Sequence, residues 1–281
     1  MPELPEVEVS RRGLLPYLQG QVIEEVIIRN GKFRQPIPEN LPDLLTGCVA
    51  KTLKRRGKYI LIEITSNAIA ETKGWVILHL GMSGSVRVVP VSDSWRKHDH
   101  FALRVGEHSI RLHDPRRFGL VVWHEGNCPE RHPLISVLGQ EPLEQMFTGE
   151  WLHARCSSRK TPIKPLLMDG HLLVGVGNIY AAESLFMAGI SPLRAASRIS
   201  RQRYDVLALA IQKTLQTSID AGGSTLRDYV HSDGGAGSFQ IQCQVYGRAG
   251  EPCLRCGGGE HTIRQIRQAG RSTFYCPGCQ H

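Results

Sequence analysis

The sequence predicts a multidomain α+β protein, with an N-terminal β-sandwich flanked by helices, a helical second part and a C-terminal zinc ribbon. Three observations lead to this class. Short apolar runs separated by Gly, Pro and Asn turns fill residues 22–123, helical spacing of apolar residues dominates the second half, and two cysteine pairs lie near the C-terminus. With 281 residues, of which 41% are hydrophobic, the chain can bury one large core or two ordinary ones.

The N-terminal part begins with a predicted helix. It starts at Pro5, because proline is favoured at the first helical position, and ends by Gly20. Six strands are then expected, at Val22–Ile28, Tyr59–Ile64, Trp75–Leu80, Phe101–Val105, Ile110–His113 and Leu120–Trp123. Short strands at regular spacing with turn residues between them are typical of a β-sandwich. Residues 126–142 are rich in turn formers and are interpreted as a connector.

The second half shows helical periodicity. A helix over Asn178–Ala188 follows the turn Gly175-Val176-Gly177, whose backbone N–H groups would suit a phosphate. A longer helix is capped by Ser200 and ends at Gly222-Gly223. Its apolar residues recur at spacings of three and four, and they are Tyr204, Leu207, Ile211, Leu215 and Ile219. This stripe predicts a packing surface.

Four cysteines predict a metal site. Cys253 and Cys256 form one C-x2-C pair, Cys276 and Cys279 form another, and 19 residues separate the pairs. Two-residue spacing lets both thiolates of a pair reach one ion at about 2.3 Å, and two pairs complete a tetrahedron. Since cysteine fills all four positions and none stays open for water, we expect one structural zinc ion.

The region between these pairs resembles a ribbon. Strands are expected over Thr262–Gln268 and Ser272–Tyr275, around a turn at Ala269-Gly270. A disulfide framework is the competing interpretation, but the chain start lacks a secretory signal and a reducing compartment disfavours disulfides. The other four cysteines stand singly and are expected to be small buried hydrophobic residues: Cys48, Cys128, Cys156 and Cys243.

Composition excludes some classes. No apolar run approaches the roughly 20 residues of a membrane span, and the start has no signal-peptide pattern. We therefore expect a soluble, intracellular protein. The formal net charge of +8 favours an anionic partner, although many basic proteins simply carry a solvated basic surface.

Five motifs and the cysteine ribbon resemble one family. In chain order the motifs are Pro2-Glu3-Leu4-Pro5-Glu6-Val7-Glu8, Lys58-Tyr59, His79-Leu80-Gly81-Met82-Ser83-Gly84, Asp114-Pro115-Arg116-Arg117-Phe118-Gly119 and Gly175-Val176-Gly177-Asn178-Ile179-Tyr180-Ala181. Together they resemble the bacterial formamidopyrimidine-DNA glycosylases, also called 8-oxoguanine DNA glycosylases. The match runs from residue 2 to residue 280.

The resemblance implies a domain organisation and an activity. It implies an N-terminal catalytic domain over residues 1–131, a linker over 132–149, a helix–two-turn–helix DNA-binding domain over 150–242 and a zinc finger over 243–281. The implied protein is a monomeric, cytoplasmic DNA glycosylase and AP lyase of base excision repair. It would excise oxidised purines from double-stranded DNA and cleave the strand by β,δ-elimination at the abasic site.

The chemistry implied for Pro2 is that of a nucleophilic amine. Removal of Met1 would expose a secondary amine, and because an α-amino group titrates near 8, part of it is unprotonated at neutral pH. Attack on C1′ expels the base and leaves an iminium ion, an electron sink that acidifies C2′ and drives both eliminations. Taken alone, Pro2 would only be the residue that follows Met1.

Other site residues are assigned by the resemblance. Glu3 would be the acid–base group that protonates the sugar ring oxygen, Glu6 would orient it, and Lys58 would act near the phosphate in elimination. Asn178 and Arg271 would grip phosphates, and Arg271 is also a candidate acid in δ-elimination. Without the resemblance, Glu6 would be a residue that complements the helix dipole and Lys58 a solvated charge.

A wedge of three side chains is implied for base flipping. Met82, Arg116 and Phe118 would occupy the vacated base stack, and Arg116 can hydrogen-bond the orphan cytosine. Without the resemblance, Met82 and Phe118 would be assigned to a core. His98 and Arg159 resemble DNA contacts, but Arg159 stands where the family usually carries lysine, which keeps the charge and changes the contact geometry.

Three alternatives stay open. Endonuclease VIII-type enzymes act on oxidised pyrimidines, but they usually carry Gly at the position of Leu4, so Leu4 and the Ser232–Ser238 loop favour the purine enzyme. The glycines of Gly234–Ser238 would let that loop cover the flipped base. A non-catalytic zinc protein that binds damaged DNA would need the ribbon without the N-terminal amine.

The third alternative is a metal-dependent nuclease. Such an enzyme needs a cluster of carboxylates for magnesium. Asp93, Asp99 and Asp114 are too scattered in the sequence to predict one.

Overall fold

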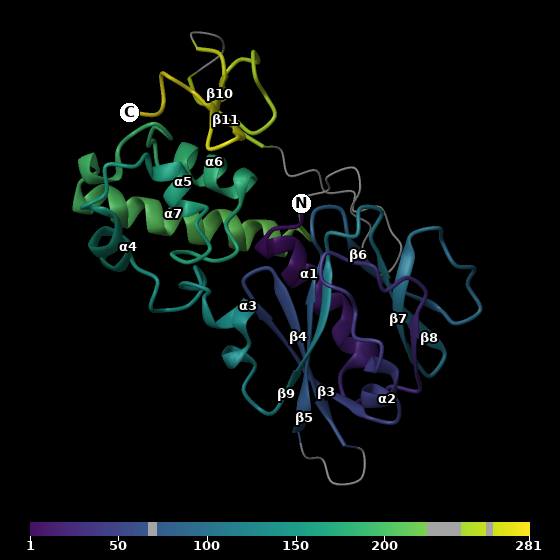
Figure 1. Cartoon of the computed structure of the whole chain (residues 1–281). Coiled ribbons are helices and arrows are strands. Elements are labelled where there is room, and N and C mark those ends of the chain that lie inside the picture. Colours follow the sequence, from purple (N-terminus) through teal and green to yellow (C-terminus); the bar gives the residue numbers. More distant parts are fainter. Residues whose placement is uncertain (67–71, 224–242, 257–260) are drawn as a thin grey trace. The chain divides into compact units, whose positions relative to one another are not determined.

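The computed structural model describes residues 1–66, 72–223, 243–256 and 261–281 (Figure 1). These residues form two compact units. One unit holds Met1–Val137 with Gly222 and Gly223, and the other holds Leu138–Ala221 with the described residues from 243 onward. The boundaries of the predicted domains and linker stay a prediction.

The first unit contains two antiparallel sheets. One sheet has the strand order β1-β3-β4-β5-β9 and the other has the order β2-β7-β8-β6. The strands are β1 (Gln21–Val22), β2 (Glu25–Ile28), β3 (Val49–Arg56), β4 (Tyr59–Thr65), β5 (Thr72–His79), β6 (Ser85–Pro90), β7 (Asp99–Val105), β8 (His108–His113) and β9 (Leu120–Glu125).

Both sheets and the first helix share one apolar core. Helix α1 (Leu4–Leu18) contacts β3 of the first sheet and β6 of the second. The buried core includes Leu14 and Leu18 of α1, Ile60, Ile62 and Ile64 of β4, Val86 of β6, Phe101 and Leu103 of β7, and Ile110 and Leu112 of β8. The expected β-sandwich with a flanking helix is confirmed. A short helix, α2 (Leu41–Leu45), adds Leu41 and Leu45 to this core.

The predicted strand Val22–Ile28 is wrong as a single element. Gln21–Val22 pairs with β3, whereas Glu25–Ile28 pairs with β7 of the other sheet. The change of sheet occurs between adjacent residues, because Ile23 N–H donates to Cys48 O at 2.8 Å and Glu24 N–H donates to Arg104 O at 2.9 Å. Apolar periodicity cannot locate such a crossing. The strands β3 and β6 were not predicted.

The expected connector contains two short helical turns, η1 (Pro129–Arg131) and α3 (Pro133–Ser136). Among the described residues, no helix is both long and apolar enough to cross a membrane.

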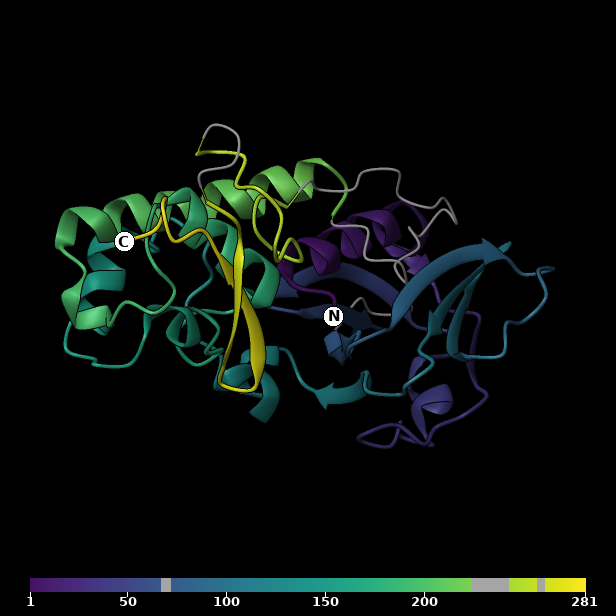
Figure 2. The ribbon, with the colours of Figure 1, turned by 90° about the horizontal axis from the view of Figure 1, so that it is seen from above.

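The second unit is helical, with a two-stranded ribbon. Its helices are α4 (Gly149–Cys156), α5 (Ile163–Leu167), α6 (Asn178–Met187), η2 (Ala196–Arg198) and α7 (Arg201–Asp220). Ser200 caps α7, with its hydroxyl accepting from Arg203 N–H, and the predicted apolar stripe of this helix is buried. The ribbon, β10 (Arg264–Gln268) and β11 (Arg271–Tyr275), lies beside α6 in both views (Figures 1 and 2).

Candidate functional site

The first turn of α1 holds the N-terminal residues in a fixed arrangement. Glu3 is the N-cap, and its N–H donates to Glu6 Oε2 at 2.8 Å, in a capping box. Both glutamates are buried, with 3% and 2% of their surfaces exposed. Because Glu6 fixes the backbone of Glu3, it also fixes the neighbouring Pro2. While Met1 is present, the Pro2 nitrogen lies in a peptide bond and has no free lone pair for attack.

Lys58 lies in the two-residue turn between β3 and β4. Arg56 pairs with Tyr59 across the turn, and Gly57 has φ +55°, as a tight turn with glycine first requires. Tyr59 pairs in turn with His79 at the end of β5, with ring centroids 4.8 Å apart. The sheet therefore places Lys58 close to His79.

His79 is a functional candidate that the sequence reasoning missed as an individual residue. Burial, followed by the charges of Lys58 and Arg34, lowers the pKa of His79 to about 4. Its Nδ1 accepts a hydrogen bond from Gly81 N–H at 2.9 Å, so the neutral ring carries its proton on Nε2. His79 is thus a neutral hydrogen-bond donor near a lysine. Its place at the end of a strand in a quoted motif was the available signal.

A cavity of about 610 Å³ opens in the first unit. Its lining is strongly cationic, and it consists of Met1, Lys32, Arg34, His79, Gly81, Met82, Arg116, Arg117 and Phe118. Such a lining favours an anionic ligand. Lys32, Arg34 and Arg117 were not selected from the sequence. Lys32 and Arg34 lie outside the quoted motifs, and Arg117 follows Arg116 in one of them but was given no role of its own.

The three predicted wedge residues lie together at this cavity. Met82 and Phe118 are 44% and 43% exposed, which excludes the core interpretation for both. The Arg116 guanidinium lies 4.6 Å from the centroid of the Phe118 ring, a cation–π contact. Three side chains able to stack or fill space are therefore presented to solvent on one face of the unit.

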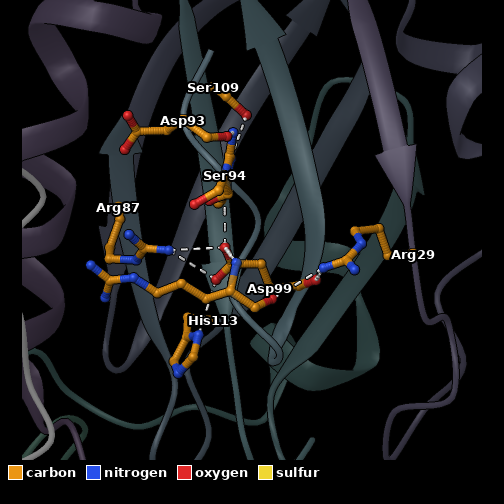
Figure 3. Close-up of polar contacts among 9 residues, drawn as sticks. Arg29, Arg87, Asp93, Ser94, Asp99, Ser109 and His113 are labelled. Carbon is orange, nitrogen blue, oxygen red and sulfur yellow. Dashed lines mark hydrogen bonds and ion pairs between the residues drawn. The ribbon is translucent and has the colours of Figure 1, made fainter. Parts of the chain in front are cut away.

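His98 precedes Asp99 in the chain and contacts the ring of His113. Figure 3 shows the network that is built on the buried Asp99 carboxylate. Asp99 is fully buried and accepts from Arg87 Nη2 at 2.9 Å on both oxygens, from Arg96 N–H at 2.9 Å and from His113 Nδ1 at 3.0 Å. Burial would raise the pKa of Asp99, but the hydrogen bonds from these groups outweigh it and hold the pKa well below its usual range. Asp99 is therefore a fixed anion.

The same network fastens the loop that precedes His98. Arg29 donates to Arg96 O and Asp99 O, at 3.1 and 3.0 Å. Arg111 donates to the carbonyls of Asp93 and Ser94 at 2.8 and 3.0 Å, and Arg29 and Arg111 both contact the Trp95 ring. His98 itself lies edge-on to His113, with ring centroids 5.8 Å apart. The loop that carries this candidate DNA contact is thus held by the buried Arg111 and the exposed Arg29.

In the second unit, a buried lysine ties α6 to the ribbon. Lys164 is 1% exposed, and its Nζ donates to Asn178 Oδ1 at 2.6 Å and to Thr273 Oγ1 at 2.7 Å. Asn178 Nδ2 donates to Ser272 O at 2.9 Å. The start of α6 is therefore joined to the start of β11, where Arg271 is exposed. Lys164 and Arg271 also line a cavity of about 190 Å³.

The sequence did not predict the burial of Lys164 or the contacts of Arg159. Nothing in the sequence around Lys164 distinguishes a buried lysine from a solvated one. Arg159 follows α4, is exposed and donates to Arg155 O at 3.2 Å. In the part of the chain that the structure describes, no hydrogen bond or ion pair joins Arg159 to Asn178 or Arg271.

The four paired cysteines form one cage. Their sulfur atoms all lie within 4.8 Å of one another. The closest separations are 3.1 Å for Cys256–Cys279, 3.5 Å for Cys256–Cys276 and 3.8 Å for Cys253–Cys279. Ligands about 2.3 Å from one tetrahedral zinc ion lie about 3.8 Å apart, so the cage fits a single zinc ion with small adjustments.

The ribbon around this cage has the predicted turn. Ala269 and Gly270 both have positive φ, +45° and +76°, between paired residues Gln268 and Arg271. The Gln280 side chain accepts from Cys276 N–H and donates to Ile190 O, which fixes the second cysteine pair against the helical part.

The single cysteines and the loop Gly234–Ser238 were also subjects of sequence expectations. Of the single cysteines, Cys48 and Cys156 are buried as expected, but Cys128 and Cys243 are only partly buried, so the expectation is wrong for those two. The loop Gly234–Ser238, expected to cover a flipped base, lies outside the described residues, as does the whole of Ser232–Ser238.

Comparison with known proteins gives consistent matches along the chain. Residues 1–121 match the family model of the formamidopyrimidine-DNA glycosylase N-terminal domain, residues 138–230 match that of the H2TH domain, and residues 250–281 match that of the zinc finger found in FPG and IleRS. The formamidopyrimidine-DNA glycosylase of Dechloromonas aromatica (strain RCB) is 58% identical over 100% of both chains.

Solved structures show the same similarity. The Lactococcus lactis Fpg in complex with abasic-site DNA is 32% identical, covers 99% of both chains and superposes with a TM-score of 0.89. A variant of that protein in complex with DNA containing Fapy-dG is also 32% identical, covers 100% of both chains and has a TM-score of 0.88.

Proposed function

The chain belongs to the formamidopyrimidine-DNA glycosylase family, and on this premise we propose that it excises oxidised purines from duplex DNA and then cleaves the strand as an AP lyase. One observation carries the proposal: Met1 and the three wedge residues line the same cavity. Removal of Met1 would leave the Pro2 amine beside side chains suited to enter a base stack. The Lactococcus lactis complexes with abasic-site and Fapy-dG DNA support the substrate class.

Binding begins with charge and continues with base flipping. The cations of the cavity attract the phosphate backbone, and such contacts position the duplex without reading its sequence. Met82, Arg116 and Phe118 then replace the everted nucleotide in the stack, with the Arg116 guanidinium bonding the orphan cytosine. His98, Arg159, Asn178 and Arg271 supply further DNA contacts.

Glycosidic cleavage uses the Pro2 amine. Its nitrogen lone pair forms a bond to C1′, the glycosidic bond breaks, and the base leaves with the bonding electrons and takes up a proton. Glu3 protonates the ring oxygen as the C1′–O4′ bond opens, and loss of the amine proton leaves an iminium ion. Glu6, through its hydrogen bond from Glu3 N–H, holds the Pro2 amine and the Glu3 carboxyl group in position.

Strand cleavage follows from the iminium. Loss of a C2′ proton sends electrons into the C=N⁺ bond, and breakage of C3′–O3′ then releases the 3′ phosphate. A second elimination releases the 5′ phosphate. Lys58 acts near the phosphate, His79 offers the neutral Nε2–H as a donor, and Arg271 is the acid of the δ step.

The remaining assignments concern the metal, the assembly and the compartment. Cys253, Cys256, Cys276 and Cys279 would hold one zinc ion that folds the ribbon and takes no part in bond breaking. The protein would act as a monomer in the bacterial cytoplasm.

Borohydride trapping tests the proposal. A duplex with one 8-oxoguanine opposite cytosine and a matched dihydrothymine duplex are incubated with the protein and borohydride, and the adduct is mapped by mass spectrometry. We expect an adduct at Pro2 that forms faster on the oxopurine duplex. Faster trapping on dihydrothymine would assign the chain to oxidised pyrimidines. Absence of an adduct on both duplexes, with a free Pro2 and tight binding, would leave a DNA-binding zinc protein.

A further inference from the structure

Two loops of the first unit cross between its sheets at neighbouring positions. Residues 80–84 connect β5 to β6, and residues 114–119 connect β8 to β9. Because β5 pairs with β9 and β6 pairs with β8, the two loops begin and end on adjacent strands. Met82 lies on the first loop, whereas Arg116 and Phe118 lie on the second. The wedge is thus assembled from two separate segments.

Asp114 bonds to both loops. It has no exposed surface (0%) and lies at the start of the second loop. Its Oδ1 accepts from Ser83 Oγ at 3.2 Å and from Arg116 N–H at 3.3 Å, and its Oδ2 accepts from Gly119 N–H at 2.8 Å. One carboxylate therefore holds two points of its own loop and the residue that follows Met82 in the other.

The two loops also touch through their backbones. A Cβ added to Gly81, which has φ +68°, would lie 2.5 Å from Gly119 N and from the Phe118 carbonyl carbon. A Cβ on Gly119 would lie 2.8 Å from His79 O and 3.1 Å from Asp114 Oδ2. Because no side chain separates the loops, a shift of one displaces the other.

We propose that Asp114 is a positioning residue for the wedge: it fixes the Met82 loop and the Arg116–Phe118 loop in one mutual arrangement before DNA binds. The inference rests on the proposed function, since only a base-flipping enzyme needs this arrangement. Exposed loop side chains lose conformational entropy when they enter a base stack, and a preset pair of loops reduces that cost. Because Asp114 is fully buried, it acts through the two loops and not by direct contact with the DNA.

The two substrates of the enzyme depend on the wedge to different extents. A lesion in a base pair must be unstacked, and the wedge must fill its place. An abasic site has no base to unstack. Loss of the Asp114 contacts should therefore slow excision of a paired lesion more than strand cleavage at an abasic site.

The test variant is Asp114→Asn. Its side chain has one acceptor oxygen, so an NH₂ group must face either Gly119 N–H or the Ser83 and Arg116 donors. Single-turnover rates are measured on an 8-oxoguanine·cytosine duplex and on a duplex with a preformed abasic site. We expect excision to fall about tenfold more than abasic-site cleavage, equal to about 1.4 kcal/mol of activation free energy. A 2-aminopurine beside the lesion should report slower wedge insertion.

Asp99→Asn is the matched control. It alters an equally buried carboxylate of the same unit, and no hydrogen bond joins Asp99 to the described wedge loops. We expect it to lower both rates by one common factor. Thermal unfolding of both variants shows how much of any loss reflects stability.

Two variants at Ser83 test the proposal if Asp114→Asn does not fold. Ser83→Ala should give a smaller selective loss, about threefold, consistent with one neutral hydrogen bond, and Ser83→Thr should restore the rate. Equal loss on both substrates in Asp114→Asn, or equal behaviour of the two Ser83 variants, would overturn the proposal. A wild-type protein that forms no borohydride adduct even at the abasic site would instead reject the proposed function.

Discussion

The functional side chains of the two units are held around different buried groups. In the first unit, buried carboxylates accept backbone and guanidinium N–H groups, as Asp99 and Asp114 do. In the second unit, a buried cation, Lys164, donates to side-chain oxygens, and a four-thiol cage closes the ribbon. An extensive β-sandwich core can anchor loops by hydrogen bonds alone, whereas a small ribbon has too little apolar surface and requires a metal.

The largest effect is expected at the first turn of α1. A protein with an uncleaved Met1 or an N-terminal tag should lose all glycosylase activity and all lyase activity, because the Pro2 nitrogen is then an amide. Strand cleavage on an 8-oxoguanine duplex measures this. Binding to undamaged duplex serves as the control and should stay within about threefold, since Lys32, Arg34, Arg116 and Arg117, the cations that attract the phosphates, are unchanged. Full activity of a protein whose tag is verified by mass spectrometry contradicts the Pro2 mechanism.

Metal removal should affect the two units differently. A structural zinc site contributes on the order of 10 kcal/mol to folding, so chelation or Cys276→Ser should unfold the ribbon. DNA affinity should fall severely, while the thermal transition of the first unit stays in place. Calorimetry and fluorescence anisotropy measure the two quantities. A chelated protein that binds DNA as tightly as before would show that the ribbon needs no metal.

Disrupting the Asp99 network should lower the free energy of unfolding more than disrupting the Lys164 network. Asp99→Asn leaves buried guanidinium groups without their anion, so the free energy of unfolding should fall by about 3 kcal/mol. The folded-state pKa of Asp99 is lowered, so its contribution is complete above about pH 4, the unfolded value, and declines as the pH falls toward the folded value. The difference between variant and wild type should therefore shrink in acid. Urea unfolding at pH 7 and pH 3 checks both statements.

Removing the buried cation of the second unit, Lys164, should lower the free energy of unfolding by less than Asp99→Asn does. Lys164→Met keeps the volume but leaves Asn178 Oδ1 and Thr273 Oγ1 without their donor, at a cost of about 1–3 kcal/mol. DNA affinity should fall because Asn178 and the strand of Arg271 lose the contacts through Lys164 and keep only the hydrogen bond from Asn178 Nδ2 to Ser272 O. Lys160→Met, an exposed lysine of the same unit, is the control for charge alone. Equal affinity loss in both lysine variants would assign the effect to net charge.

The smallest expected effect is the titration of His79. Because its folded pKa is lowered to about 4, the unfolded chain binds the proton more tightly, and folding stability should rise with pH between about 4 and 6.5. Nitrogen-15 NMR should show a neutral ring with the proton on Nε2 at pH 7. A His79 that titrates near 6.5 would mean that Lys58 and burial do not act on this ring.

Sequence spacing could predict the metal site, because each pair of its residues lies close together in the sequence, whereas the catalytic and DNA-contact roles stay predictions. The zinc cysteines follow from two C-x2-C pairs, and the exposed Met82 and Phe118 agree with the wedge rather than the core. What could not be predicted is set by contacts far along the chain. Lys164 is buried only because Thr273 and Asn178 surround its ammonium group, and the pKa of His79 depends on a neighbouring strand.

The β-strands illustrate the same limit. Alternation predicted a strand over Tyr59–Ile64, which the structure extends to Thr65, because Ile60, Ile62 and Ile64 share one face. It missed Val49–Arg56, in which lysines and arginines replace apolar residues on the outer face. It also merged two strands across Ile23 and Glu24, where apolar residues continue although the hydrogen-bond partner changes.

That crossing has a consequence for how the first unit folds and unfolds. The adjacent N–H groups of Ile23 and Glu24 bond to Cys48, next to β3, and to Arg104 of β7, so two adjacent peptide units tie the first sheet to the second. Residue 24 must meet residue 104 before the second sheet is complete, and such distant pairing makes folding slow. Hydrogen exchange should therefore show the two sheets opening together, as one cooperative unit with a single protection level.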